Sequence, residues 1–327
     1  MDLDLVFLGT SGSAPTARRA TSALLVRRGG ERLLFDCGEG TQRQLLRSSV
    51  GLVDLQEIFV SHFHADHYLG LPGMLKTFAL RQRDVPLTVY GPPGLRDLFD
   101  SLRRVVGKLT YPLDIVEVRA GQALARDGYE VRVFPVEHGV SAVGYAVVED
   151  TRPGRFDVET ADAFGVPAGP ERGALQRGEA VTLADGRVVE PDSVLGAPRP
   201  GRTIVIPGDT APAETVRVLA EGADVLVHEA SFCEDERDRA RETMHSTARQ
   251  AAEVAEDAAV RLLALTHLSP RYFGPEIARE AREVFPNTIV PRDFDIVEVP
   301  LPERGEPRLV KGGARPEREV AEGVAAG

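Results

Sequence analysis

The chain has 327 residues, of which 43% are hydrophobic and 27% charged, the balance of a globular protein with a sizeable core. Its 50 acidic and 39 basic residues give a net charge of −11, which argues against a protein whose whole surface binds nucleic acid but allows a limited RNA-binding patch. Two cysteines and the lack of any apolar run of ~18 residues exclude a disulfide framework and a membrane-spanning helix. The start of the chain is acidic, unlike a signal peptide, so we expect a cytoplasmic protein with no membrane partner.

The first half of the chain, residues 1–148, alternates short apolar runs with helical patterns. Short runs bounded by Gly, Asp or Ser predict strands at Leu3–Leu8, Ser22–Arg27, Arg32–Phe35, Glu57–Val60, Pro86–Tyr90, Ile115–Val118, Glu130–Pro135 and Gly144–Val148. Apolar residues at helical spacing predict helices at Gly40–Arg47, Gly70–Arg81 and Leu95–Val105.

The segment at about 149–200 is rich in proline and glycine and has no sustained apolar period. It predicts an extended insertion or arm with a small hairpin formed by Ala180–Leu183 and Arg187–Glu190. A disordered linker is the alternative.

Regular structure resumes at about residue 201. Apolar runs predict strands at Thr203–Ile206, Val225–Val227, Leu262–Leu265 and Phe294–Val299, and helical patterns appear at Pro212–Ala220, Thr247–Ala259 and Pro275–Val284. The Thr247-x-x-Gln250 start of one helix fits a capping box. Residues 301–327 lack an apolar period and are expected to form a mobile tail. We therefore expect one domain, residues 1–300, built from halves 1–148 and 201–300 whose sheets pack face to face.

The most informative local motif is His62-Phe63-His64-Ala65-Asp66-His67, which places three imidazoles and a carboxylate within six residues. His62 and His64 project to the same side of an extended segment. These ligands suit Zn²⁺, and also Mn²⁺ or Fe²⁺. One tetrahedral ion that keeps an open position cannot use all four, so two neighbouring ions are the simplest interpretation. A chance cluster on a polar loop is the alternative, which is poor for a chain with seven histidines.

Three further candidate ligands follow predicted strands: His138, Asp209 and His267. Taken alone, each of these residues is more simply interpreted as an ordinary hydrogen-bonded loop residue. As a set they complete two sites of three or four ligands, with Asp209 able to bridge them. Two ions ~3.5–4 Å apart are the arrangement used for phosphoester hydrolysis, because they acidify a shared water.

The motif His62-x-His64-x-Asp66-His67, with the later His138, Asp209 and His267, resembles the metallo-β-lactamase fold superfamily. This resemblance implies an α+β fold, a four-layer αββα sandwich with a dinuclear metal site between its sheets. It leaves the reaction open, because lactamases, thioesterases, sulfatases and nucleases share the fold. Five other segments narrow the choice of reaction, because they resemble ribonuclease Z, the endonuclease that removes 3′ trailers from precursor tRNA. These segments are residues 8–15, 36–44, 207–210, 228–232 and 244–248.

The resemblance to ribonuclease Z implies a role for each site residue. It places His62, His64 and His138 on one ion, Asp66, His67 and His267 on the other, and Asp209 between them. Asp66 would also orient or deprotonate the attacking water. His245 would donate a proton to the leaving 3′ oxygen, and Glu229 would fix the tautomer of that imidazole. Without the resemblance, a surface histidine before an ordinary helix is the simpler reading of His245.

In that family a long arm between the two halves grips the tRNA, and residues 164–178 resemble its tip. The resemblance implies that precursor tRNA contacts the arm through backbone groups exposed at glycines and through local positive charge. The candidate substrate-binding residues are Gly165, Pro167, Gly169, Pro170, Arg172, Gly173 and Arg177. The resemblance further implies two Zn²⁺ per subunit, a homodimer and no DNA partner.

Two other functions compete with the tRNA endonuclease. A small-molecule phosphodiesterase or arylsulfatase of the same fold would not need the arm. A non-catalytic RNA-binding protein with structural metals would have closed sites and no reason to place His245 and Glu229 nearby. His228 and Cys37 carry no predicted chemistry, and we expect both to be packed.

Overall fold

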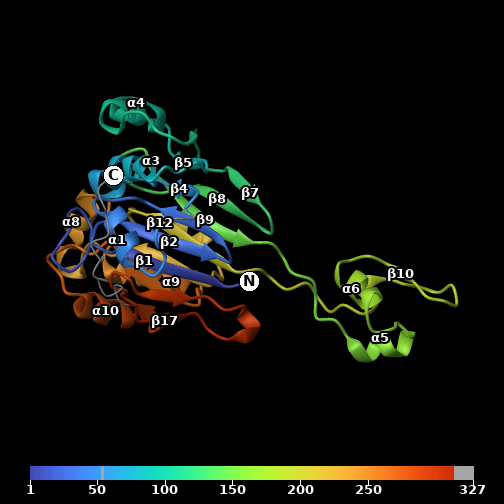
Figure 1. Cartoon of the computed structure of the whole chain (residues 1–327). Coiled ribbons are helices and arrows are strands. Elements are labelled where there is room, and N and C mark those ends of the chain that lie inside the picture. The colour runs from blue at the N-terminus through green and yellow to red at the C-terminus, as the bar shows by residue number, and fades with distance from the viewer. Residues whose placement is uncertain (53–54, 313–327) are drawn as a thin grey trace.

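The computed structural model describes residues 1–52 and 55–312. Two β-sheets pack face to face, helices cover their outer faces, and one long insertion projects from the body (Figure 1). No helix in these ranges is both long and apolar enough to cross a lipid bilayer.

The first sheet has eight strands in the order β17-β16-β1-β2-β3-β4-β5-β6. Strands β3 to β6 run parallel, and the other neighbours pair antiparallel. Its strands are β1 (Leu3–Gly9), β2 (Ala23–Arg28), β3 (Glu31–Phe35), β4 (Glu57–Phe59), β5 (Leu87–Gly91), β6 (Leu113–Glu117), β16 (Ile296–Glu298) and β17 (Arg308–Val310). The helices packed on its outer face are α1 (Thr41–Arg47), α3 (Gly70–Leu80) and α4 (Leu95–Val106).

The second sheet has seven strands in the order β15-β14-β13-β12-β9-β8-β7. Strands β12 to β15 run parallel, and β9, β8 and β7 continue antiparallel. Its strands are β7 (Ala123–Arg126), β8 (Tyr129–Pro135), β9 (Val143–Glu149), β12 (Thr203–Gly208), β13 (Val225–Glu229), β14 (Leu263–Thr266) and β15 (Thr288–Ile289). The helices on its outer face are α7 (Glu214–Leu219), α9 (Ala248–Asp257) and α10 (Gly274–Arg282).

Side-chain alternation along the strands creates the layers. In β1, Leu5 and Phe7 face the core between the sheets, whereas Val6 and Leu8 face the helices. Because successive side chains of a strand point to opposite faces, a strand buried on both faces reads as a continuous apolar run. Both sheets contain such strands, and the expected α+β sandwich of four layers, αββα, is confirmed.

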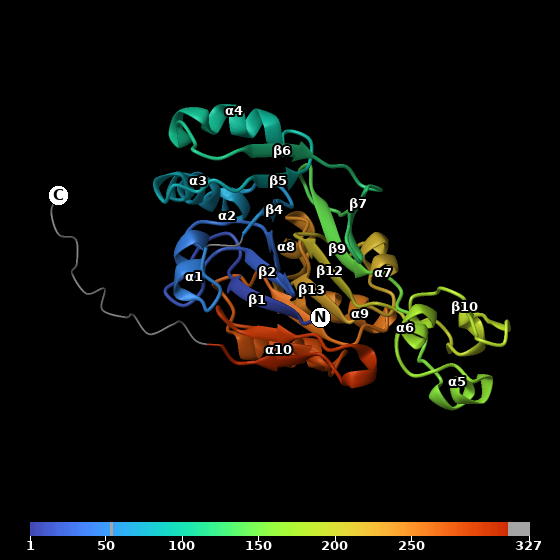
Figure 2. The ribbon, with the colours of Figure 1, turned by 45° about the vertical axis from the view of Figure 1, so that its right-hand side comes forward.

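The insertion, residues 151–200, forms an arm with its own small core (Figure 2). It contains α5 (Val158–Phe164), α6 (Pro170–Gln176), β10 (Val181–Thr182), β11 (Val188–Val189) and the 3₁₀ turn η1 (Pro191–Ser193). The predicted hairpin is present as β10 and β11. The two helices were not predicted. Their few buried apolar side chains, such as Ala161 and Leu175, pack on the hairpin without repeating at helical spacing.

The expectation of a mobile tail from residue 301 is wrong for its first part. Residues 302–304 form the 3₁₀ turn η3 (Pro302–Arg304), and β17 then pairs antiparallel with β16. One sheet edge stabilises this short strand, and its three residues carry no periodic signal of their own. The remainder of the predicted tail, residues 313–327, lies outside the described residues. The strands β7 and β15 and the short helices α2 (Ala65–Tyr68) and α8 (Arg237–Glu242) were also not predicted.

Candidate metal centre

The histidine motif lies where β4 ends and the chain turns into α2. His64 is the extended N-cap residue of this helix, and Asp66 and His67 lie within it. The turn that follows β3 supports α2, because Cys37 N–H donates to His67 O at 2.8 Å and Gly70 N–H donates to Cys37 O at 2.8 Å. Local backbone hydrogen bonds therefore hold the whole motif against the first sheet.

This packing explains a glycine of the 36–44 segment. A Cβ atom on Gly38 would lie 2.2 Å from the backbone oxygen of Asp66, far inside van der Waals contact. We expect Gly38→Ala to lower the stability of the protein by ~1–3 kcal/mol, the usual cost of overpacking, and to weaken metal retention, because α2 must move. Thermal unfolding and elemental analysis measure the two effects. Gly30→Ala is the control, since its Cβ meets nothing within 4 Å, and equal effects of the two variants would contradict the explanation.

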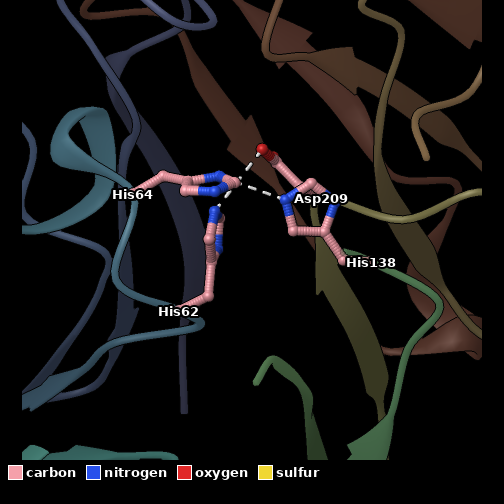
Figure 3. Close-up of side chains that lie close together, drawn as sticks. All are labelled: His62, His64, His138 and Asp209. Atoms are coloured by element: carbon pink, nitrogen blue, oxygen red, sulfur yellow. Dashed lines mark hydrogen bonds and ion pairs between the residues drawn. The ribbon is translucent and has the colours of Figure 1, made fainter. Parts of the chain in front are cut away.

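The first group of candidate ligands consists of His62, His64, His138 and Asp209, whose ligand atoms all lie within 4.8 Å of one another (Figure 3). His138 Nε2 lies 3.1 Å from His64 Nδ1, and His62 Nε2 lies 3.7 Å from Asp209 Oδ2. His138 comes from the loop after β8 and Asp209 from the end of β12. The structure thus brings together side chains from both sheets.

The second group consists of Asp66, His67 and His267. His267 Nε2 lies 3.1 Å from Asp66 Oδ2 and 3.3 Å from His67 Nε2. Asp209 Oδ2 lies 3.3 Å from His67 Nε2 and 3.2 Å from His267 Nε2, so this carboxylate also touches the second group. All seven predicted ligands converge, with Asp209 placed between the two groups as a bridging residue must be.

The hydrogen bonds of the histidines fit a cation at both groups. His138 Nδ1–H donates to Met244 O at 3.1 Å, His67 Nδ1–H to Asp36 Oδ2 at 2.7 Å, and His267 Nδ1–H to Ser231 Oγ at 2.9 Å. With Nδ1 donating, Nε2 of each ring faces the centre and can bind a metal, the tautomer that metal ligands adopt. Burial lowers the pKa of His67 and His267, but the Asp209 carboxylate outweighs burial and raises it, so a bound cation would take the place of a proton there. His67 Nε2 and His267 Nε2 lie only 3.3 Å apart, a distance that needs either a proton or a metal cation between the two nitrogens.

Buried polar atoms without partners support the same fit. His62 Nε2 and Asp209 Oδ1 are buried and have no hydrogen-bond partner among the described residues. Such groups cost free energy unless something satisfies them. Burial lowers the pKa of His62 to about 2, so this imidazole is neutral. Burial opposes ionisation of Asp66 and Asp209, but His67 and His267 lower the pKa of both carboxyls. Neutral imidazoles and ionised carboxylates are the ligand forms of Zn²⁺, Mn²⁺ and Fe²⁺.

His245 lies at the mouth of the centre, and its side chain is 14% exposed. Its Nδ1–H donates to Glu229 Oε1 at 2.7 Å. Burial lowers the pKa of His245, but the Glu229 carboxylate outweighs burial and raises it to about 9. The predicted capping box is confirmed, because Thr247 and Gln250 exchange hydrogen bonds at the start of α9. The cap fixes the helix start at Ala248, three residues after His245.

Comparisons with known proteins give close relatives over almost the whole chain. The ribonuclease Z of Halorubrum lacusprofundi is 49% identical over 311 residues, which cover 94% of this chain and 100% of that protein. The chain belongs to the ribonuclease Z family. As a ribonuclease Z it is an enzyme, a metal-dependent endoribonuclease.

Solved structures agree with this assignment. Human tRNase Z, short form, is 27% identical, with a TM-score of 0.67 over 91% of this chain and 99% of that one. The metallo-β-lactamase fold protein YhfI from Bacillus subtilis also has a TM-score of 0.67, over 91% of this chain and 100% of that one, and at 20% identity it supports the fold alone. A family model described as "Anti-Pycsar protein Apyc1" matches residues 3–150, less than half of this ribonuclease Z.

Two site residues of this ribonuclease Z were missed by sequence reasoning. Asp36, at a φ of 59°, accepts hydrogen bonds from Ser61 N–H, Ser61 Oγ–H and His67 Nδ1–H. Ser231 Oγ–H donates to Glu229 Oε2 at 2.7 Å while its oxygen accepts from His267. Both residues lie inside segments that the sequence singled out, but the histidines they contact, His67 and His267, are distant along the chain.

Asp36 fixes His67, so its charge should matter for metal binding. We expect Asp36→Asn to lower metal affinity by about 10–100-fold, because the amide no longer stabilises the Nδ1–H form of His67 as the carboxylate does. Competition with a chelator measures the affinity. Asp192→Asn, an exposed change on the arm, is the control and should leave it unchanged, and an unchanged affinity in Asp36→Asn would refute the role.

The arm differs from expectation in its charge. The resemblance predicted local positive charge from Arg172 and Arg177, but Arg172 pairs with Asp162 and donates to Val166 O, and Arg177 pairs with Glu179. The arm also has eight acidic residues against six arginines. These two guanidinium groups are therefore neutralised within the arm.

The glycines of the arm serve its turns. Gly165 ends α5 at a φ of 78°, and Gly169, at 138°, precedes Pro170, which starts α6. Gly173 lies within α6, and Pro167 lies between the two helices. Backbone groups exposed beside these glycines are therefore the part of the arm that can contact RNA.

The two residues without predicted chemistry are packed. His228 pairs with Leu265 in the sheet and so faces the α9 side, and its Nδ1–H donates to Glu229 O. Cys37 is fully buried, and burial raises the pKa of its thiol. Neither side chain offers a nucleophile to the metal centre.

Proposed function

We propose that this enzyme removes the 3′ trailer from precursor tRNA, leaving a 3′-hydroxyl on the tRNA and a 5′-phosphate on the trailer, and that it does so with two zinc ions per chain. The observation that carries the proposal is the position of Asp209. Its carboxylate contacts both groups of converging ligands, which is the role of a bridging ligand in a dinuclear site.

The ligand sets of the two ions follow from the two groups. We propose that His62, His64 and His138 hold one ion and that Asp66, His67 and His267 hold the other. When bound, the pair of ions would acidify a water molecule and neutralise charge on the phosphoryl oxygens. The remaining steps belong to side chains of the chain itself.

Asp66 is placed to orient the attacking water. Its Oδ2 accepts a hydrogen bond from Ser13 N–H at 2.7 Å and lies 3.1 Å from His267 Nε2. These contacts hold Oδ2 in place, and we propose that the Asp66 carboxylate accepts a proton from water in the centre.

His245 is placed to protonate the leaving 3′ oxygen of the RNA. Because Glu229 Oε1 accepts the Nδ1–H proton, Nε2 is the nitrogen free to donate. Thr210 N–H donates to Glu229 Oε1 at 3.0 Å, and Ser231 Oγ–H donates to Oε2 at 2.7 Å, so the carboxylate that orients His245 is itself fixed.

We propose that the arm is the second contact for the substrate. It projects from the body as a unit with its own core, and it would hold the tRNA at a distance from the metal centre (Figure 2). The exposed backbone around Gly165 and Gly169 would contact RNA phosphates, and Pro167, Pro170 and Gly173 would form the surface around it.

We also propose that the enzyme is a homodimer. Light scattering would then give twice the mass of one chain.

One assay tests the function. The zinc-loaded protein is incubated with a 3′-extended tRNA precursor, and the product ends are mapped. We expect a single cut that leaves a 3′-hydroxyl on the tRNA. Hydrolysis of a small chromogenic phosphodiester with the precursor left intact would instead indicate a small-molecule hydrolase. Binding of the precursor without any cleavage would indicate a non-catalytic RNA-binding protein, and either result would refute the proposal.

A further inference from the structure

The arm is joined to the body by two adjacent strands of chain, and these strands are paired closely. Arg152 and Arg199 stand opposite each other in an antiparallel bridge, with hydrogen bonds of 2.7 and 2.9 Å between their backbones. A Cβ atom on Gly154 would lie 1.8 Å from the backbone oxygen of Gly196. Since the two strands touch, the stalk is a two-stranded ribbon.

The bridge places two like charges side by side. Residues directly opposite in an antiparallel pair project to the same face, where like charges repel. Here the carboxylate of Glu303 lies between the guanidinium groups. Glu303 Oε1 lies 2.7 Å from Arg152 Nη1 and 2.9 Å from Arg199 Nη1, and Oε2 lies 2.9 Å from Arg152 Nη2. One carboxylate therefore binds both strands of the stalk, and it does so bidentately with Arg152.

Hydrogen bonds within the stalk keep the two arginines in place. Arg152 Nη2 also donates to Pro200 O at 3.2 Å, and Arg199 Nε donates to Pro153 O at 3.1 Å. The side chains of Arg152, Arg199 and Glu303 are between 22% and 34% exposed, so the cluster is partly shielded from solvent. The hydrogen bonds from Arg152 lower the pKa of Glu303 to about 2, so the carboxylate is charged at neutral pH.

The segment that carries Glu303 is fixed to the body on both sides. Before it, Arg202 Nη1 donates to Val299 O at 2.8 Å. After it, Arg261 donates to Gly305 O at 2.5 Å and pairs with Glu306 at 3.0 Å, and β17 then joins the first sheet. Figures 1 and 2 place this C-terminal segment, in red, on the side of the body from which the arm leaves. Glu303 thus connects a rigid part of the body to the stalk.

We propose that Glu303 is a positioning residue that clamps the stalk and so fixes the direction in which the arm leaves the body. The proposal rests on the proposed function in one respect, because a fixed arm benefits catalysis only if the arm holds RNA. An arm of fixed direction loses less orientational freedom when it binds, which is an advantage in affinity. The segment that carries Glu303 would thus hold the stalk of the arm, a role that its sequence does not indicate.

The first test measures the arm itself. Spin labels are attached at Ala184→Cys, in the turn of the arm hairpin, and Glu253→Cys, on α9, both exposed. The two native cysteines are buried and should not react. We expect a narrow distribution of label distances in the otherwise unchanged chain and a broad one when Glu303→Gln is added. Glu130→Gln, which removes a partly exposed acid whose ion pair, with Arg132, lies within β8 of the body, is the matched control and should keep the narrow distribution.

The second test measures catalysis with the full chain. We expect Glu303→Gln to raise KM for precursor tRNA by about three- to tenfold, as loss of a partly exposed ion-pair network implies, with kcat nearly unchanged. Hydrolysis of a small chromogenic phosphodiester should not change, which also shows that the variant folds. Arg152→Gln should have a smaller effect, because Arg199 keeps its contact with Glu303. The double variant should be no worse than Glu303→Gln, which already removes both contacts.

The outcomes separate the clamp from the proposed function. A narrow distance distribution in Glu303→Gln would overturn the clamp, whatever the enzyme cuts. A broad distribution with an unchanged KM would overturn its role in positioning RNA. Failure of the unaltered chain to cleave precursor tRNA would refute the proposed function but leave the distance measurement as a valid test of the clamp.

Discussion

We expect His245→Ala to lower the cleavage rate of precursor tRNA by about 10²–10⁴-fold, the usual contribution of a general acid. The leaving 3′ oxygen of RNA is an alkoxide, which departs slowly without a proton. In the structure, His245 Nε2 is the nitrogen left free by the Glu229 hydrogen bond. Single-turnover cleavage measures the rate, while metal content and precursor affinity should stay near those of the unaltered enzyme.

A substrate with a good leaving group gives the control for this variant. Nitrophenolate departs without being protonated, so hydrolysis of a nitrophenyl phosphodiester should be much less sensitive to His245→Ala than RNA cleavage is. Glu229→Gln should show the same selectivity in weaker form, because the imidazole remains but loses its charged partner. Equal losses on both substrates would mean that His245 supports the metal centre instead of donating a proton.

The second large effect is expected from removal of the arm. A deletion that ends inside the hairpin would leave Val181, Val189 and Val194 without the partners with which they form the arm core. Deleting residues 153–198 and joining the stalk with two glycines removes that core whole, and the ends already meet, because Arg152 and Arg199 are paired. We expect kcat/KM for precursor tRNA to fall by at least about 10²-fold, since a second binding site on the substrate is lost.

Small substrates again provide the control for this deletion. Hydrolysis of a small chromogenic phosphodiester and the zinc content should stay within about twofold of the unaltered enzyme, because the arm core shares no residues with the clusters that build the sandwich. A matched loss of both activities would show that the arm is needed for the fold of the body. An unchanged kcat/KM for precursor tRNA would remove the arm from the substrate-binding surface.

Much of the sandwich could be predicted because its signals are local. The strand β13 shows why, since Val225 and Val227 face one core and Leu226 the other, giving an unbroken apolar run. The strands β7 and β17 give weaker signals. The residues of β7 are exposed or only half-buried, and β17 exists through its pairing with β16. A segment whose stability comes from a distant partner leaves little trace in its own composition.

The candidate site also has a part that could be predicted from the sequence and a part that could not. The types of the seven converging residues, and the spacing of His62, His64, Asp66 and His67, are legible in the sequence because metal ligands belong to few residue types. What orients those ligands was not predicted. Asp36 reaches His67 across 31 positions, and a hydrogen bond of that span follows from the pairing of β3 with β4. No spacing rule applies to such a contact.

The four layers, the candidate metal ligands and the insertion could all be predicted, because burial patterns, ligand chemistry and glycine-rich turns are properties of short segments. The sequence did not predict that Asp36 contacts His67, that Arg172 pairs with Asp162 inside the arm, or that Glu303 pairs with both arginines of the stalk. Each of these depends on which charge lies next to which, and electrostatic and hydrogen-bond energies fall off within a few ångströms. They are therefore set by how distant segments pack.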